Sequence, residues 1–223
     1  MHGKIVEECK GAIAMNKLQT CTELVKDIYN GMDASHDFQH IERVYKNAET
    51  ILTTEPTADA ETVLLAVLLH DVSDVKYTDS KENEERILRE LALSAEQVQH
   101  IKDIIESVSF NGGNEVEAKS LEARIVRDAD RLDAIGAVGI ARTFAYGGAK
   151  GRKLYDDAEE ARFNMSAEDY RSKSTASVTH FYEKLLLLKD LMVTPKGKEM
   201  AEDRHAFMLS FLQQLQKERD GIA

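Results

Sequence analysis

The residues best suited to chemistry stand at the end of an apolar run. Val63–Leu69 is followed at once by His70 and Asp71 and, three positions later, by Asp74. A short apolar run has no readable period, so by itself it fits a buried strand or a buried helix. An isolated buried carboxylate is too costly to leave without a partner. The His70-Asp71 pair must therefore be neutralised, hydrogen-bonded or bound to a metal ion.

Two further segments carry residues of the same kind. His36 and His40 are four positions apart and would share one face of a helix, although this spacing alone more often marks a surface pair than a metal site. The acidic segment Arg127–Asp133 lies within an apolar helical pattern. At about 100° per residue, Asp128 points roughly opposite to Asp130. Only one of these two can face the site, and Asp130 is the better candidate.

Two histidines and two carboxylates without a thiol form a mixed nitrogen and oxygen ligand set. Such a set suits a divalent ion, with Mn²⁺ or Mg²⁺ favoured over Fe²⁺, Ni²⁺, Co²⁺ or Zn²⁺, and leaves positions for water and substrate. The chemistry is hydrolytic by default, because the ion lowers the pKa of bound water and polarises a phosphoryl oxygen. Asp74 is the candidate general base or water-orienting residue if the helix continues for another turn; otherwise it is a cap or an exposed loop acid.

The flanks of the apolar run predict that its support is a helix. Thr57 is a suitable cap, Ala58–Glu61 are good first-turn residues with acids at the positive end of the helix dipole, and no Gly or Pro interrupts before Val72. We therefore predict a buried central helix that delivers His70 and Asp71 from the core.

The rest of the chain also favours helices, and two prolines in 223 residues fit long ones. A capping box at Ser94–Gln97 and the pair Thr194-Pro195 mark two helix starts. Residues 147–153 form the strongest predicted break, a flexible basic loop. The predicted helices cover residues 4–29 (one or two), 36–52, 80–91, 94–108, 116–146 (one long or two abutting), 166–190 and 195–218. The predicted fold class is all-α, a single-domain helical bundle over residues 1–223, with a motif-bearing core at about 30–150 and C-terminal helices within 155–218 packed on it.

The composition limits the function classes. A net charge of −11 argues against broad binding to nucleic acid or to an anionic membrane. The N-terminus has no apolar signal region, and no apolar run approaches the roughly 20 residues of a membrane span, so we expect a soluble, cytoplasmic protein. Cys9 and Cys21 indicate neither a disulfide framework nor a cysteine metal site, and reduced core thiols are the simpler interpretation.

Three segments in this order resemble the motifs of the HD-domain phosphohydrolases: His40-Ile41-Glu42-Arg43-Val44, Leu68-Leu69-His70-Asp71 and Asp128-Ala129-Asp130-Arg131-Leu132. The resemblance covers roughly residues 30 to 150, and the joint occurrence of the three segments is far more specific than any one of them. It implies an all-helical fold and a divalent ion held by His40, His70, Asp71 and Asp130. That ion would activate water against a phosphoester or phosphoanhydride.

The resemblance also bears on the substrate. The stretches Asp130–Gly136 and Arg142–Gly148 are similar to a small bacterial subgroup that includes nucleoside triphosphate pyrophosphohydrolases. A small phosphorylated compound, most simply a nucleotide, is then the expected partner. His36 is not the usual ligand in this family and would contact substrate or water, or lie on the surface. The alternatives are a nucleoside monophosphate or cyclic-nucleotide hydrolase, and a non-catalytic nucleotide-binding signalling module.

A nucleotide substrate would need cations beyond the metal ion, and several lie near the motifs. Lys76 follows Asp71 by five positions, where it is either a phosphate contact or a solvated loop residue. Arg43 and Arg131 could contact phosphate or pair with neighbouring acids such as Glu42 and Asp133. The basic loop is a lid or, more simply, a connector. The apolar stretches Leu185–Leu188 and Phe207–Leu215 predict core packing or a homodimer face rather than a cofactor site.

Overall fold

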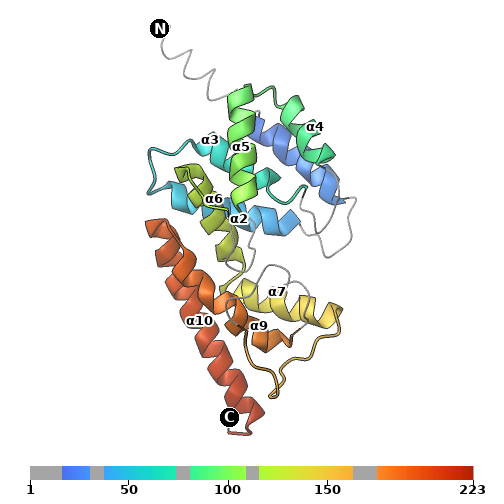
Figure 1. Ribbon diagram of the computed structural model, residues 1–223, viewed down its shortest axis with the longest axis vertical. Helices are drawn as coiled ribbons and strands as arrows, with labels where there is room; N and C mark the ends of the chain where they lie inside the picture. Colours follow the sequence, from blue (N-terminus) through green and yellow to red (C-terminus); the bar gives the residue numbers. More distant parts are fainter. Residues whose placement is uncertain (1–16, 31–37, 74–80, 109–115, 163–174, 223) are drawn as a thin grey trace. The chain divides into compact units, whose positions relative to one another are not determined.

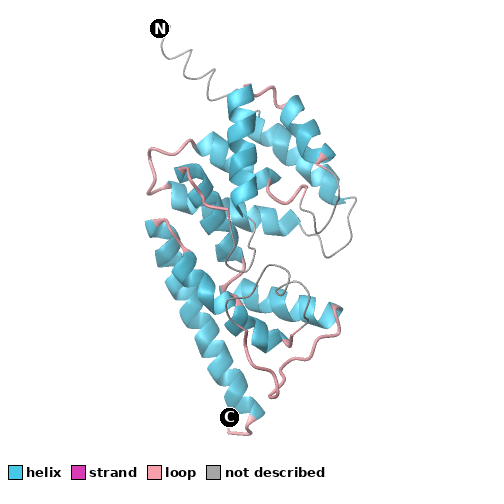
Figure 2. Ribbon diagram, viewed as in Figure 1, coloured by secondary structure: helices cyan, strands magenta, loops and turns pink. Residues whose placement is uncertain are grey.

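The computed structural model describes residues 17–30, 38–73, 81–108, 116–162 and 175–222. Every regular element within these ranges is helical (Figures 1 and 2). The all-α prediction is therefore confirmed for this part of the chain. The chain divides into two compact units, Met1–Val108 with Ala118–Val126, and Ser109–Glu117 with Arg127–Ala223. The prediction that one domain spans the whole chain stays a prediction.

The first unit is built around α3 (Ala60–Leu69), whose residues from Thr62 to Leu69 are all buried. This helix packs against α2 (Phe38–Leu52) and α5 (Ala95–Val108) (Figure 1). The unit also contains a helix over residues 17–30, α4 (Glu82–Glu90) and the start of α6 (Leu121–Asp133). The buried central helix predicted from the apolar run is confirmed.

The start of α3 differs from the prediction, because Asp59 and not Thr57 is its N-cap. The Asp59 carboxylate accepts hydrogen bonds from the backbone N–H of Thr62 at 3.3 Å and from the Thr62 hydroxyl at 2.8 Å. At the other end the helix stops at Leu69, and His70 is the C-cap with helical φ of −60° and ψ of −29°.

The capping box that opens α5 is confirmed. The Ser94 hydroxyl accepts from the backbone N–H of Gln97 at 3.2 Å, while the Gln97 side chain accepts from the backbone N–H of Ser94 at 3.1 Å. This reciprocal pair satisfies two of the N–H groups that a helix start leaves without an intrahelical partner.

The second unit contains α7 (Gly136–Ala149), α9 (Ser177–Glu183) and α10 (Pro195–Arg219). Helix α7 packs against α10 and α9, and the fully buried Phe181 ring lies 5.9 Å from Phe144 and 6.1 Å from Phe211, measured between ring centroids. Thr194 caps α10 and Pro195 follows it, as predicted. Within the apolar stretch of α10, Met208 and Leu212 are buried, whereas Phe207 is exposed.

The predicted continuous helix over residues 166–190 is wrong in its described part. Helix α9 ends at Glu183, Lys184 has non-helical φ of −139° and ψ of −60°, and a 3₁₀ helix η1 (Leu185–Leu191) follows. In a 3₁₀ helix, residues three apart align on one face. Leu185 and Leu188 are accordingly buried, so the tighter helix turns both toward the core.

The predicted break at residues 147–153 begins later than expected, because α7 continues through Ala149. Gly147 is buried within this helix, and a Cβ atom added there would collide with the Ser177 hydroxyl of α9. This glycine therefore permits close helix packing rather than a flexible loop.

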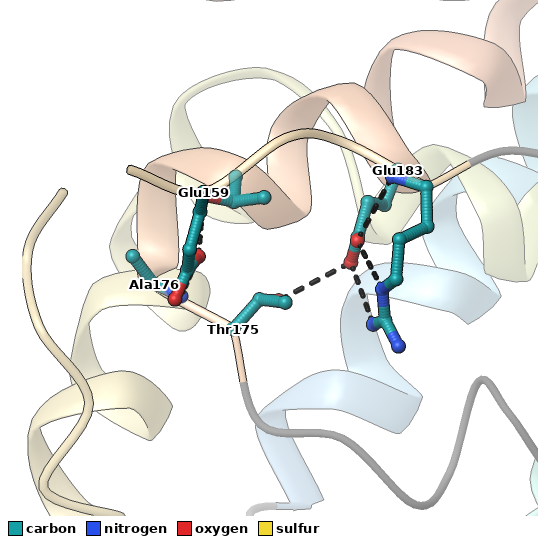
Figure 3. A network of polar contacts seen from close by, with 6 residues as sticks. Glu159, Thr175, Ala176 and Glu183 are labelled. Atoms are coloured by element: carbon teal, nitrogen blue, oxygen red, sulfur yellow. Dashed lines mark hydrogen bonds and ion pairs between the residues drawn. The ribbon is translucent and has the colours of Figure 1, made fainter. Parts of the chain in front are cut away.

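A polar network joins the stretch after α7 to both ends of α9. The Glu183 carboxylate accepts from the Arg162 guanidinium at 2.7 and 3.1 Å and from the Thr175 hydroxyl at 3.2 Å (Figure 3). The Glu159 carboxylate accepts from the backbone N–H of Ala176 and from the Thr179 hydroxyl, each at 2.8 Å. These acids have closely matched donors, so they stabilise the packing of this unit.

Two smaller expectations concern the thiols and the membrane. Cys21 is buried and free, and burial raises its pKa to about 12, so it is an unreactive core thiol as predicted. Cys9 lies outside the described residues. None of the described helices combines the length and the apolar character that a membrane crossing requires.

Candidate metal centre

The side chains of His40, His70 and Asp71 meet in the first unit. Each offers one ligand atom, and these atoms all lie within 4.8 Å of one another. The Nε2 atom of His40 is 3.3 Å from one Asp71 carboxylate oxygen, and Nε2 of His70 is 3.7 Å from the other. The two imidazole centroids are 5.4 Å apart. The structure therefore brings together three of the four ligands implied by the family resemblance.

The backbone of α3 orients the His70 ring. Its Nδ1 atom lies 2.7 Å from the carbonyl oxygen of Val67, one helical turn earlier. A carbonyl only accepts, so Nδ1 carries the proton and, in the neutral ring, Nε2 keeps a lone pair directed toward Asp71. Histidine ligands in metalloproteins commonly have such a partner on their second nitrogen. Val67 was not predicted from the sequence, because a backbone acceptor has no residue signature.

Burial and helix packing hold the three groups at one place. His40 lies on α2 beside the buried Ile41, and His70 follows directly on the fully buried α3. Both histidines are buried, whereas the Asp71 side chain retains 21% of its exposure. The site thus has two rigidly supported imidazoles and one carboxylate that solvent can reach.

The donor set fits a divalent cation. Ligand atoms about 2.1 Å from an ion and at right angles to each other are about 3 Å apart. The measured separations of 3.3 and 3.7 Å between the imidazole nitrogens and the Asp71 oxygens are close to that value. Two nitrogens and one carboxylate leave further coordination positions for another protein ligand, water or substrate.

The two aspartates of α6 have different environments, in keeping with their opposite helical phase. Asp128 is fully buried and accepts hydrogen bonds from Val193 and Thr194 within the second unit. Burial raises the pKa of its carboxyl above the ordinary value, while these hydrogen bonds act in the opposite direction. Asp130 is only partly buried. Asp128 is thus engaged in packing, and Asp130 as the metal ligand of this segment stays a prediction.

The predicted phosphate contacts within the described residues have different surroundings. Arg43 lies on α2, one helical turn after His40, and is partly buried. Arg131 is buried and donates from its Nη1 atom to the Leu191 carbonyl oxygen at 2.6 Å. His36, Asp74 and Lys76 lie outside the described residues, so their predicted roles stay predictions.

The basic residues after α7 are engaged locally. Lys153 pairs with Asp156, and Lys150 and Arg152 lie over the Tyr146 ring at 5.8 and 5.1 Å from its centroid. These contacts show that the positive charge is held at the end of α7, and a contact with substrate remains a prediction.

Comparison with known proteins finds a matching domain family and a related bacterial protein. The family model described as the HD domain matches residues 37–135. The uncharacterized protein YpgQ of Bacillus subtilis is 39% identical over 204 residues, which cover 89% of this chain and 91% of that protein.

Solved structures agree with this relationship. A protein from Lactobacillus plantarum has a TM-score of 0.81 and 33% identity, covering 92% of this chain and 98% of its own. An HD-superfamily hydrolase from Bacillus thuringiensis has a TM-score of 0.73 and 38% identity, covering 93% and 98%. YpgQ in complex with ADP has a TM-score of 0.74 and 35% identity, covering 92% and 96%.

Proposed function

Because the chain belongs to the HD-domain family, we propose that it is a divalent-metal-dependent phosphohydrolase acting on a small nucleotide. One observation carries the proposal: His40, His70 and Asp71 offer ligand atoms within 4.8 Å of one another at the positions of the family motifs. An HD-type fold alone would not carry it, since function depends on the site rather than on the scaffold.

The proposed ligand set is His40, His70, Asp71 and Asp130. A divalent ion held there, with Mn²⁺ or Mg²⁺ as the first candidates, would supply Lewis acidity and lower the pKa of bound water. The Val67 carbonyl keeps the proton of His70 on Nδ1, away from the ligand atom. The neutral imidazole is the form of histidine that binds a metal ion.

The proposed substrate is a nucleotide, with a nucleoside triphosphate cleaved to pyrophosphate as the first candidate. The YpgQ complex with ADP supports a nucleotide ligand, because that protein is related to this chain over most of its length. In this proposal Lys76, Arg43 and Arg131 neutralise phosphate charge, and Asp74 accepts the proton of the attacking water. A local group of cations is needed, since the chain as a whole carries a net charge of −11.

The test is a nucleotide panel assayed after the metal content of the purified protein has been measured. Tri-, di- and monophosphates and cyclic nucleotides are incubated with the protein with Mn²⁺, with Mg²⁺ or with a chelator, and the products are separated. We expect pyrophosphate and monophosphate from the triphosphates, with loss of activity in the chelator. Turnover of monophosphates or cyclic nucleotides alone would move the activity to the alternative substrate class. Nucleotide binding without any turnover by the metal-loaded protein would overturn the proposal in favour of a signalling module.

A further inference from the structure

The buried Asp128 carboxylate is held by the segment that begins α10. One of its oxygens accepts from the backbone N–H and the hydroxyl of Thr194, each at 2.7 Å, and from the backbone N–H of Val193 at 3.0 Å. The Thr194 hydroxyl in turn accepts from the backbone N–H of Gly197 at 3.1 Å, as the N-cap of α10. Because a hydroxyl has one proton, its donation to Asp128 and its acceptance from Gly197 fix its orientation.

The junction is closely packed around Gly197. A Cβ atom built on Gly197 would lie 2.6 Å from the Thr194 hydroxyl oxygen and 2.7 Å from the Asp128 carboxylate. Thr194 already caps α10, so the helix start has its cap without the carboxylate. A buried carboxyl group is costly unless it is hydrogen-bonded, and the donors of Val193 and Thr194 meet this need for Asp128.

Two further bonds hold the same side of α6. Arg131, three residues after Asp128, donates to the Leu191 carbonyl oxygen at 2.6 Å, and Arg204 of α10 donates to the Leu132 carbonyl oxygen. Residues three apart share one face of a helix. The segment before α10 and α10 itself therefore contact α6 along one face. Asp130 lies at about 160° from Asp128 around the axis of α6.

We propose that Asp128 is a positioning residue, which fixes the rotation of α6 about its axis and thereby the direction of the Asp130 carboxylate. The inference rests on the proposed function, in which Asp130 is a metal ligand. A carboxylate about 6 Å from the axis moves by about 3 Å when a helix rotates by about 30°. Functional groups need to be held within about 0.5 Å of their productive position, so a modest rotation of α6 would misplace the Asp130 carboxylate.

The test measures the Mn²⁺ dissociation constant of the full chain by calorimetry, independently of activity. Asp128→Asn keeps the size of the side chain but removes the negative charge, and its amide nitrogen replaces the oxygen that accepts from the Val193 N–H at 3.2 Å. We expect Mn²⁺ to bind about 10- to 100-fold more weakly, as when a residue that supports a ligand is replaced. Thr194→Val removes one of the donors, and we expect about 3-fold weakening, whereas Thr194→Ser keeps the hydroxyl and the wild-type affinity.

Glu159→Gln is the matched stability control, because Glu159 also accepts a backbone N–H and a threonine hydroxyl at a helix start in this unit. We expect it to lower the melting temperature without changing Mn²⁺ affinity. Equal weakening in Glu159→Gln, or wild-type affinity in both Asp128→Asn and Thr194→Val, would overturn the inference. Should Asp128→Asn fail to fold, the comparison of Thr194→Val with Thr194→Ser decides.

Asp130→Ala separates the two proposals. Wild-type Mn²⁺ affinity in that variant contradicts the proposed ligand set, whereas a loss there without a loss in Asp128→Asn contradicts only the positioning role.

Discussion

Each unit of the molecule contains a cluster around a carboxylate, but the two clusters have opposite character. In the second unit, Glu183 receives two guanidinium donors of Arg162 and the Thr175 hydroxyl (Figure 3). Burial raises the pKa of Glu183, and the hydrogen bonds from Arg162 and Thr175 outweigh it, so the pKa is lowered overall. The charge of this carboxylate is balanced by side chains of the protein itself.

In the first unit, Asp71 instead faces the Nε2 atoms of His40 and His70 at 3.3 and 3.7 Å. The Val67 carbonyl holds the proton of His70 on the far nitrogen, so a lone pair of this ring points toward the carboxylate. Groups that each offer a lone pair gather favourably around a cation. The two carboxylates therefore differ in their partners, because imidazole nitrogens face Asp71 whereas guanidinium and hydroxyl donors satisfy Glu183. Such partners help to separate a candidate metal site from a structural ion pair.

The largest expected effect is the loss of metal binding on Asp71→Ala. We expect Mn²⁺ affinity to fall by more than about 100-fold, because even replacing supporting partners of a ligand costs 10- to 100-fold. Hydrolysis should be abolished while the helical circular dichroism stays that of the wild type. Calorimetry with Mn²⁺ and the nucleotide assay measure the two losses. The matched control is Glu90→Ala, since Glu90 belongs to an exposed ion pair with Arg86. Full hydrolysis by Asp71→Ala would remove the metal site from the proposal.

For Glu183→Ala we expect the opposite pattern, a loss of stability without a loss of Mn²⁺ affinity. Removing this acid leaves the Arg162 guanidinium, whose side chain is only 23% exposed, without its main counter-charge. Breaking such a pair should lower the free energy of unfolding by about 3 kcal/mol, at the lower end for buried pairs because Arg162 is partly solvated. Mn²⁺ affinity of the folded protein should not change. Urea unfolding measures the first quantity, with Glu90→Ala expected to cost less than about 0.5 kcal/mol. A large loss of metal affinity in Glu183→Ala would erase the distinction between the clusters.

The sequence indicated the candidate metal cluster far better than the cluster around Glu183, for a physical reason. The His70-Asp71 pair follows a helix that local apolar pattern and first-turn acids already predict, and His40 lies on a second amphipathic helix. By contrast, Arg162 and Glu183 are 21 positions apart in the sequence. Arginine and glutamate are common surface residues, so nothing in their local context predicts this contact.

Two helix boundaries were predicted wrongly for the same reason, because they depend on contacts between residues far apart in the sequence. Thr57 and Asp59 are both capping residues, and the choice falls on Asp59, whose backbone N–H also donates to the Glu122 carboxylate of α6 at 3.1 Å. The end of α9 at Lys184 likewise depends on tertiary packing, since it lets Leu185 and Leu188 turn inward together. Local propensity does not contain these long-range contacts.

His180 extends the comparison to a histidine outside the candidate site. Burial, followed by the nearby Lys184 and Arg152, lowers its pKa from 6.5 to about 4, and Glu183 opposes this shift. The folded protein thus binds the proton less readily than the unfolded chain, so stability should rise with pH between about 4 and 6.5 and fall as the solution is acidified through this range. The contribution is at most about 3 kcal/mol. Urea unfolding across this range, in wild type and in His180→Phe, measures the difference, and an unchanged pH slope in the variant would contradict the assignment.

The smallest expected effect tests whether the different effects on metal binding and stability come from the clusters themselves or from the units that contain them. Asp59 lies in the same unit as the metal cluster and at the opposite end of α3 from His70, where it caps the helix. Its carboxylate, like that of Glu183, has matched donors: the backbone N–H and the hydroxyl of Thr62.

Asp59→Ala should therefore lower the free energy of unfolding by about 1 kcal/mol, the usual cost of a lost N-cap. Mn²⁺ affinity should stay within about 2-fold of wild type, because the buried packing of α3 against α2 and α5 holds His70 without the cap. Asp59→Asn, which retains a capping side chain, is the control and should recover most of the stability. Weakened Mn²⁺ binding in Asp59→Ala but not in Asp59→Asn would mean that the cap transmits strain along α3. The rigidity of the site would then depend on both ends of this helix.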